Sequence, residues 1–176
     1  RELAVNAAAI DVDLMVSYLA GGGAGNAQVL LRSTVQPRYL HFEDYDAYAI
    51  ANGQVREGIE LRSAYPDENG EGAEDARNPK VLASSLTLEP SGALRTKIGP
   101  LPKIDSPQDL STELEFRDPN GEVQTVSSRI PLWNSRVLVG IKPDSWAVTK
   151  ESLRFHLLAL DLQGKPAAGV PVQAEL

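Results

Sequence analysis

The sequence contains no cysteine and only two histidines. Disulfides, thiolate nucleophiles and cysteine zinc sites are therefore excluded. No run approaches the ~18 apolar residues that predict a membrane-spanning helix. Acidic residues outnumber basic ones by 24 to 17, for a net charge of −7. This balance provides no basic stripe for nucleic acid phosphates or for an anionic membrane surface.

The 176 residues are 42% hydrophobic, which is enough to build the core of one or two domains. Fourteen glycines and twelve prolines are spread along the chain, and they predict many turns between short elements. No long helical pattern is found. Because the chain opens on Arg1 without a methionine or an apolar signal segment, we expect a processed chain or a fragment.

Apolar and polar residues alternate in runs that recur about every ten residues, which predicts an all-β sandwich. The first strand is expected over residues 10–19, with Ile10, Val12 and Leu14 on the apolar face. A glycine-rich turn then leads to a strand over residues 27–35. A phosphate-binding loop is disfavoured there, because no Lys-Ser/Thr pair follows the glycines.

Two hairpins are predicted further along the chain. Residues 86–88 and 93–98 flank the turn sequence Glu-Pro-Ser-Gly, so we expect them to pair. Residues 110–116 and 123–133 flank Asp118-Pro119-Asn120-Gly121, in which proline and glycine suit a tight reversal. This second hairpin has the clearer alternation of apolar and polar residues.

Two segments lack a regular alternation. Residues 38–59 contain Tyr39, Phe42, Tyr45 and Tyr48 at spacings of three, which fits one helical turn or a bulged strand, and irregular β structure is favoured. Residues 65–80 are acidic and without an apolar face, which predicts a mobile surface loop.

A domain boundary is predicted at Trp133, giving one β-sandwich over residues 1–133 and the first strands of a second over residues 134–176. Strands are expected at 137–141 and 153–162, the latter with Phe155, Leu157 and Ala159 on its apolar face. Alternation still continues at Leu176. We therefore expect a second domain that another chain or fragment completes, or that is open and packed against a neighbour.

No catalytic, cofactor-binding or metal-binding residue is predicted. His41 and His156 lie 115 positions apart, and we expect them in different domains. The acidic segment from Asp67 resembles half of a calcium loop, but Asn78 stands where a bidentate Glu is needed. Calcium binding is therefore disfavoured.

Other reactive side chains also fit structural roles better. Neither Ser84-Ser85 nor Ser127-Ser128 lies near a histidine or lysine base in the sequence. Glu113 and Glu115, about 7 Å apart on one strand face, have the residue types of a glycosidase pair, but a charged solvent-facing stripe explains them more simply. Trp133 and Trp146 are candidates for sugar stacking, although Trp133 is better explained as a core or junction residue.

Several segments resemble the macroglobulin domains of bacterial alpha-2-macroglobulins. Residues 153–172 are similar to the strand–turn–strand that opens such a domain, with Pro166 at a strand start and Gly169 at a bend. Similar segments in the first half are Tyr18-Leu19-Ala20-Gly21-Gly22-Gly23-Ala24, the aromatics Phe42, Tyr45 and Tyr48, the turn at residues 118–121, and Pro131-Leu132-Trp133.

The resemblance implies an antiparallel, immunoglobulin/fibronectin-like fold in a periplasmic, usually lipid-anchored protease inhibitor. Stacked macroglobulin domains form a cage that traps a protease after it cuts a bait segment, and many members also capture it through a Cys-Gln thioester. This chain has no cysteine for a thioester and no recognisable bait. It would be a non-catalytic scaffold whose partners are the other macroglobulin domains and the trapped proteases, with any lipid anchor outside it.

Two other classes of protein stay open. One is a free-standing binding module, such as an adhesin or a carbohydrate-binding repeat, and aromatics exposed on one face would favour it. The other is an accessory β domain of a secreted hydrolase, which would need its catalytic domain elsewhere in the gene.

Overall fold

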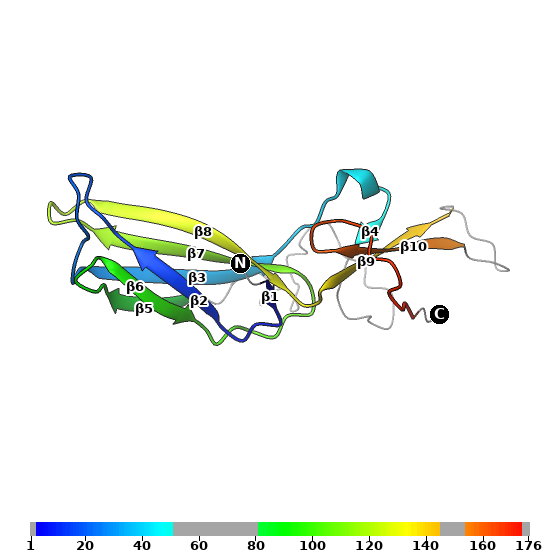
Figure 1. Cartoon of the computed structure of the whole chain (residues 1–176), viewed down its shortest axis with the longest axis horizontal. Helices are drawn as coiled ribbons and strands as arrows, with labels where there is room; N and C mark the ends of the chain where they lie inside the picture. The colour runs from blue at the N-terminus through cyan, green and yellow to red at the C-terminus, as the bar shows by residue number, and fades with distance from the viewer. Residues whose placement is uncertain (1–2, 51–80, 145–153, 174–176) are drawn as a thin grey trace, which may run out of the picture.

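The computed structural model describes residues 3–50, 81–144 and 154–173. Within these ranges the predicted all-β fold is confirmed, and no helix is long and apolar enough to cross a membrane. The elements are β1 (Ala4–Val5), β2 (Ile10–Met15), β3 (Gln28–Pro37), the 3-10 turn η1 (Glu43–Tyr45), β4 (Ala49–Ile50), β5 (Leu82–Thr87), β6 (Ala93–Ile98), β7 (Gln108–Arg117), β8 (Val123–Trp133), β9 (Val137–Pro143) and β10 (Phe155–Asp161). They form a larger and a smaller body, placed end to end (Figure 1).

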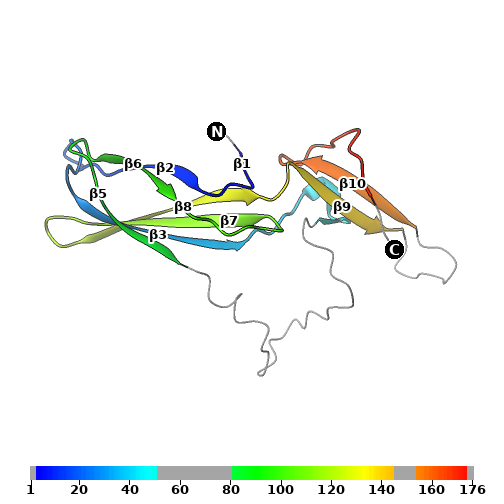
Figure 2. The same ribbon diagram turned by 90° about the horizontal axis from the view of Figure 1, so that it is seen from below.

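The larger body is a β-sandwich (Figure 2). One layer has five strands in the order β1-β8-β7-β3-β5, and β2 with β6 forms the other. Alternate side chains of β3 and β7 point between the layers, because successive residues of a strand face opposite ways. Val29, Leu31, Leu110, Leu114 and Phe116 are buried there.

The hairpin predicted at residues 118–121 is confirmed. β7 and β8 pair antiparallel from Gln108–Leu132 to Arg117–Val123. The N–H of Gly121 donates to the carbonyl oxygen of Asp118 over 3.0 Å, and Gly121 has a φ of +90°, which glycine adopts without steric cost.

The hairpin predicted between residues 86–88 and 93–98 is wrong. The turn at residues 89–92 exists, but β5 pairs with β3 and β6 pairs with β2, so the chain changes layer at this turn. Leu88, directly after β5, is 2% exposed. The chain passes from one layer to the other next to this buried residue. The sequence of the turn alone does not reveal that change of layer.

The glycine-rich segment after β2 lies at the tip of the sandwich. The apolar face of β2 is confirmed, but the strand ends at Met15 rather than residue 19, because the Val16 carbonyl oxygen accepts from the Ala24 N–H, 2.9 Å away, and no longer from β6. A Cβ at Gly23 would stand 1.8 Å from the carbonyl oxygen of Ser91. Glycine is therefore required for the glycine-rich segment to pack its backbone against the backbone of the turn at residues 89–92.

The smaller body contains a three-stranded sheet in the order β10-β9-β4. Residues 38–50 join it, although they precede the predicted boundary at Trp133: Ala49 and Ile50 pair with Ile141 and Gly140. The aromatics at spacings of three include one 3-10 turn, in contrast to the irregular β structure favoured from the sequence. The N–H of Tyr45 donates to the carbonyl oxygen of Phe42 over 2.8 Å, which matches three residues per turn.

The apolar face of β10 was predicted wrongly. Leu160 is fully buried and Leu158 is half-buried in the core of the smaller body, whereas Leu157 is 42% exposed. Because Leu157 and Leu158 are adjacent and both apolar, either face of this strand satisfies the alternation. The core residues of neighbouring elements decide which face is buried.

The alternation that continues to Leu176 does not produce a strand over residues 170–173, which are irregular, and residues 174–176 lie outside the described part of the chain. The turn at residues 161–164 is present, and the Gly164 N–H donates to the Asp161 carbonyl oxygen over 3.0 Å. Gly164 has a φ of +82°, and a Cβ there would stand 2.5 Å from the Phe42 ring. This turn therefore covers Phe42.

Candidate functional site

The two histidines both belong to the smaller body, because residues 38–50 pack with β9 and β10. His41 Nδ1 lies 3.5 Å from Asp46 Oδ1, and His156 Nε2 lies 3.2 Å from Asp144 Oδ1. All four side chains are more than half exposed. Each histidine thus has a carboxylate neighbour at the surface.

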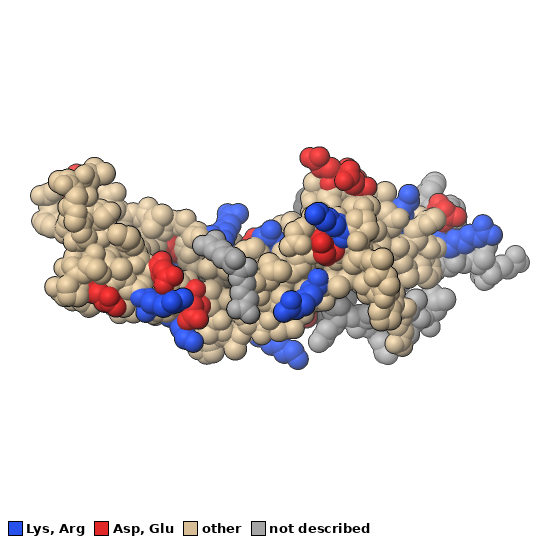
Figure 3. Space-filling model, in the orientation of Figure 1, with Lys and Arg blue, Asp and Glu red and all other residues tan. Residues whose placement is uncertain are grey.

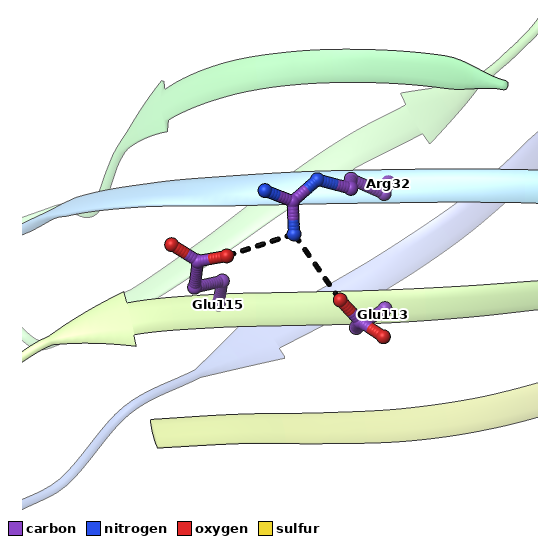
Figure 4. Close-up of polar contacts among 3 residues, drawn as sticks. All are labelled: Arg32, Glu113 and Glu115. Atoms are coloured by element: carbon purple, nitrogen blue, oxygen red, sulfur yellow. Dashed lines mark hydrogen bonds and ion pairs between the residues drawn. The ribbon is translucent and has the colours of Figure 1, made fainter. Parts of the chain in front are cut away.

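Glu113 and Glu115 lie on the outer face of β7, as predicted (Figure 4). Arg32 of β3 lies between them, with Nη1 at 3.2 Å from Glu113 Oε1 and at 2.7 Å from Glu115 Oε2. The hydrogen bond to Glu115 contributes most to raising the pKa of Arg32. The two carboxylates share one cation, so the three side chains form a cross-strand ion cluster.

The remaining candidates do not gather into a site. Ser84 and Ser85 lie on β5, and the strands β3 and β7 separate them from Ser127 and Ser128 on β8. No group of three or more His, Asp or Glu side chains in the described residues is arranged to hold a metal ion. The acidic segment that begins at Asp67 lies outside the described residues, and so does Trp146.

Charged side chains are scattered with both signs on the face shown in Figure 3. Exposed Glu43 and Asp44 of η1 form a small acidic patch on the smaller body, and the glycine-rich tip of the sandwich is nearly free of charge. This surface has no continuous basic stripe, so its charge pattern offers no track for a phosphate backbone.

The junction between the two bodies is the best-defined cluster of interacting side chains. Trp133 ends β8 of the sandwich, yet its side chain, 4% exposed, packs in the core of the smaller body with Leu138 and Leu160. Val5, which is in register with Trp133 on β1, packs against the same core. A strand of the larger body therefore supplies the central aromatic residue of the smaller one.

Arg38 links three elements at this junction. Its Nη1 forms an ion pair with Asp109 Oδ1 at 2.5 Å, and its guanidinium carbon lies 5.2 Å from the centre of the Trp133 ring. The backbone N–H of Arg38 donates to the Pro107 carbonyl oxygen over 3.0 Å. The Asp109 side chain is only 17% exposed, so the ion pair is less screened by water than one at the surface.

Two asparagines, Asn6 and Asn134, also form hydrogen bonds at the junction. Asn6 Nδ2 donates to the backbone oxygen of Asn134 over 3.0 Å, and the Asn6 N–H donates to that of Trp133 over 2.8 Å. Asn134 Nδ2 in turn donates to the carbonyl oxygen of Asp105 over 2.7 Å. These bonds connect the N-terminal segment, the loop before β7 and the link from β8 to β9.

The sequence identified Trp133 as a core or junction residue but did not identify Arg38, Asp109, Asn6 or Asn134. Arg38 and Asp109 are 71 positions apart, and only the antiparallel register of β3 and β7 brings them together. The available signal was weak: a charged residue directly after Pro37, which ends an apolar strand, and another at the start of β7.

No protein-family model matches the chain, and a search of curated proteins found no match either. Solved structures do match its fold. Escherichia coli alpha-2-macroglobulin activated by porcine elastase covers 93% of the chain, with a TM-score of 0.59 and 16% identity. The same protein in its native conformation covers 93% with a TM-score of 0.61 and 14% identity, and Salmonella alpha-2-macroglobulin reacted with methylamine gives the same three values.

The junction and the two bodies define an all-β, sandwich-based structural unit. Its fold is that of a stretch of bacterial alpha-2-macroglobulin, which agrees with the resemblance found in the sequence. The chain spans 10–13% of the length of these three structures.

Proposed function

We propose that the chain is a scaffold segment of an alpha-2-macroglobulin-like protease trap. The observation that carries the proposal is the fold match over 93% of the chain, which extends beyond the sandwich into the smaller body. A scaffold segment has to hold neighbouring units in a fixed relation. The junction around Trp133, Arg38 and Asp109 provides suitable contacts for that task.

In this proposal the segment has no catalytic activity of its own. Arg32 pairs with both Glu113 and Glu115, and each histidine has a surface carboxylate as its neighbour. The purified chain should therefore hydrolyse neither peptide nor glycoside substrates. Turnover that copurifies with the chain and disappears on substitution of one of its side chains would contradict this part of the proposal.

The division at Trp133 into units 1–133 and 134–176 also stays a proposal, with residues 38–50 packing onto the second unit. The bait segment, any thioester and any lipid anchor would lie in other parts of the parent protein. The partners would be its other macroglobulin domains and trapped proteases. The location that we propose is the periplasm, with anchoring at the inner membrane.

The test compares the full-length protein with the 176-residue chain, each mixed with an active protease. The full-length protein should protect a large protein substrate while the protease still cleaves a short peptide, because a cage excludes only large substrates. The isolated chain should protect neither the large protein substrate nor the short peptide from cleavage. Full-length protein that leaves cleavage of the large substrate unchanged would refute the trap.

Among the described residues, exposed aromatics do not favour the binding-module alternative. Tyr39 is 94% exposed and Tyr18 is 41% exposed, but they lie beyond opposite ends of the ten-residue strand β3. A sugar-binding platform needs aromatic rings side by side on one face, so this pair does not provide one.

A further inference from the structure

The strand β5 has one edge without a partner strand. It is the last strand of the five-stranded layer, and among the described residues β3 alone pairs with it. β5 lies along one margin of the sandwich (Figure 1). Pairs with and without hydrogen bonds alternate along an antiparallel ladder. The Leu88 N–H donates to the Ala27 carbonyl oxygen over 2.9 Å, and this bond fixes where the alternation starts.

The alternation leaves a row of backbone groups directed at the free edge. Counting back from Leu88, the residues that exchange hydrogen bonds with β3 are Leu86, Ser84 and Leu82. The backbone N–H and C=O groups of the residues between and after them therefore point away from β3. These residues are Ala83, Ser85 and Thr87, and all three are exposed. Their donors and acceptors are available for strand addition.

β5 carries no feature that blocks pairing at this edge. Sheet edges are usually protected by charged residues or prolines, or they are very short. β1 has two residues, and the other edge strands of the sandwich carry Asp11 and Asp13 on β2, Arg95 and Lys97 on β6, and Arg129 and Pro131 on β8. The sequence of β5 is Leu-Ala-Ser-Ser-Leu-Thr, without a charge or a proline.

A small pocket lies beside this edge, between β5 and β6, with room for about two water molecules. Ser84 is in register with the core residue Leu31, so its side chain points to the inner side of the layer. A residue placed opposite Ser84 on an added strand would point the same way, into the pocket. The residues around the pocket include Leu31, Ser33, Leu82, Ser84, Thr96 and Ile98.

We propose that β5 binds an extended peptide segment of a separate protein, which joins the sheet as an antiparallel strand. The backbone of Ala83, Ser85 and Thr87 would supply the affinity, and the pocket would supply the specificity. Because the pocket is small and three of its residues carry hydroxyl groups, the side chain opposite Ser84 would be small and uncharged, such as Ser, Thr or Ala. This activity is independent of protease trapping.

The order of the strands favours a separate protein as the source of the segment. β1, near the first described residue, lies at the opposite edge of the layer from β5. The last described residues follow β10 in the smaller body. Neither end of the described chain is therefore next to β5. A second copy is disfavoured, because two chains of net charge −7 would repel each other.

The probe is the acetylated and amidated peptide Lys-Thr-Val-Thr-Ser-Thr-Lys. In the antiparallel register its central Thr lies opposite Ser85 and its Ser lies opposite Ser84. An N-methyl group on the central Thr removes an N–H that points to β5, whereas an N-methyl group on the Ser removes one that points to solvent. Binding of the three peptides to the 176-residue chain is measured by isothermal titration calorimetry.

We expect saturable binding of the unmodified peptide, a loss of tenfold or more on methylation of the central Thr, and a change below about threefold on methylation of the Ser. Replacing the Ser of the peptide by Trp should also weaken binding tenfold or more, because Trp does not fit the pocket. Equal affinities of the two methylated peptides, or no saturation up to about 1 mM, would overturn the proposal.

A matched pair of protein variants tests the same edge. Ser85→Pro removes the N–H that points away from β3, and proline is tolerated on an edge strand at such a position. It should weaken binding tenfold or more with an unchanged circular dichroism spectrum, whereas Ser85→Ala, which keeps the N–H, should bind as the wild type does. Equal binding by both variants would contradict the role of this edge.

Two further results would overturn the proposal in favour of another occupant. Self-association of the chain that Ser85→Pro abolishes would assign the edge to a second copy. Slow amide exchange at Ala83, Ser85 and Thr87 in the monomeric chain without peptide would show that the edge is already covered. We expect a monomer in which these amides exchange rapidly and become protected when the peptide is added.

Discussion

Arg38 contacts the start of β7 and the end of β8 at the junction, and its charge is balanced there by a partly buried carboxylate. The ion pair with Asp109 joins β7 to the segment after β3, and the cation lies beside the Trp133 ring. Removing one partner of such a pair leaves the other poorly solvated and without its counter-charge. Arg32 differs, because its contacts with Glu113 and Glu115 are more exposed to water than the pair of Arg38 with Asp109.

We predict that Arg38→Met lowers the free energy of unfolding by about 1–3 kcal/mol, since it removes a charged hydrogen bond and strands Asp109. Urea unfolding followed by Trp133 fluorescence measures this, with Trp146→Phe as the background. The matched control is Arg129→Met on the exposed part of β8, which should change stability by less than about 0.5 kcal/mol. Equal effects of the two substitutions would contradict the assigned role of Arg38.

At the scale of elements, the local features of the sequence were predicted and the non-local ones were not. The β7–β8 hairpin follows from alternation and a four-residue turn, both of which are local. The partners of β5 and β6 depend on which layer each strand joins, and the turn between them has the same sequence signals in either case. The buried face of β10 likewise depends on Trp133 and Leu138, which lie outside that strand.

The packing of the tip predicts that two neighbouring glycines differ in their response to alanine. Gly23→Ala should cost about 3 kcal/mol, because the new methyl group collides with the Ser91 backbone. Gly21 has a φ of +98° but no neighbour within 4 Å, so Gly21→Ala should cost only about 1–2 kcal/mol through backbone strain. Thermal unfolding of both variants measures the difference, and the opposite order would show that the two loops do not pack as described.

The corrected face of β10 gives another matched pair. Leu160→Ala should lower stability by about 2–5 kcal/mol, because it opens a cavity among Trp133 and Leu138. In the isolated chain, Leu157→Ala should cost less than about 1 kcal/mol, since its side chain is already half in water. Chemical denaturation of both variants decides between the two faces, and a larger loss for Leu157→Ala would restore the face predicted from the sequence.

At the scale of the whole molecule, the two bodies share side chains across the junction. The sequence placed a boundary at Trp133, and the structure shows that this residue belongs to a strand of one body and to the core of the other. The sequence could not reveal that residues 38–50 pack with β9, because the two-residue strand β4 has too little pattern to be detected. The polar contacts of the junction were missed for a different reason, namely that they join segments far apart in the sequence.

Loss of the shared tryptophan should therefore affect the two bodies unequally. Trp133→Ala should weaken the smaller body by about 3–5 kcal/mol, because it removes the largest side chain of that core. Amide hydrogen exchange should accelerate in β9 and β10, whereas the central strands β3 and β7 of the sandwich stay protected. Uniform acceleration across both bodies would show that they unfold as one unit.

The most direct test of the scaffold role is protease shielding by the full-length protein with and without an intact junction. The quantity measured is the cleavage of a large protein substrate relative to that of a short peptide. We expect the wild type and Arg129→Ala to lower this ratio about tenfold or more, and Trp133→Ala to lose most of that protection, because a loosened junction no longer holds neighbouring domains in place. A wild-type ratio equal to that of free protease, or full shielding by a Trp133→Ala protein whose smaller body exchanges rapidly, would contradict the scaffold role.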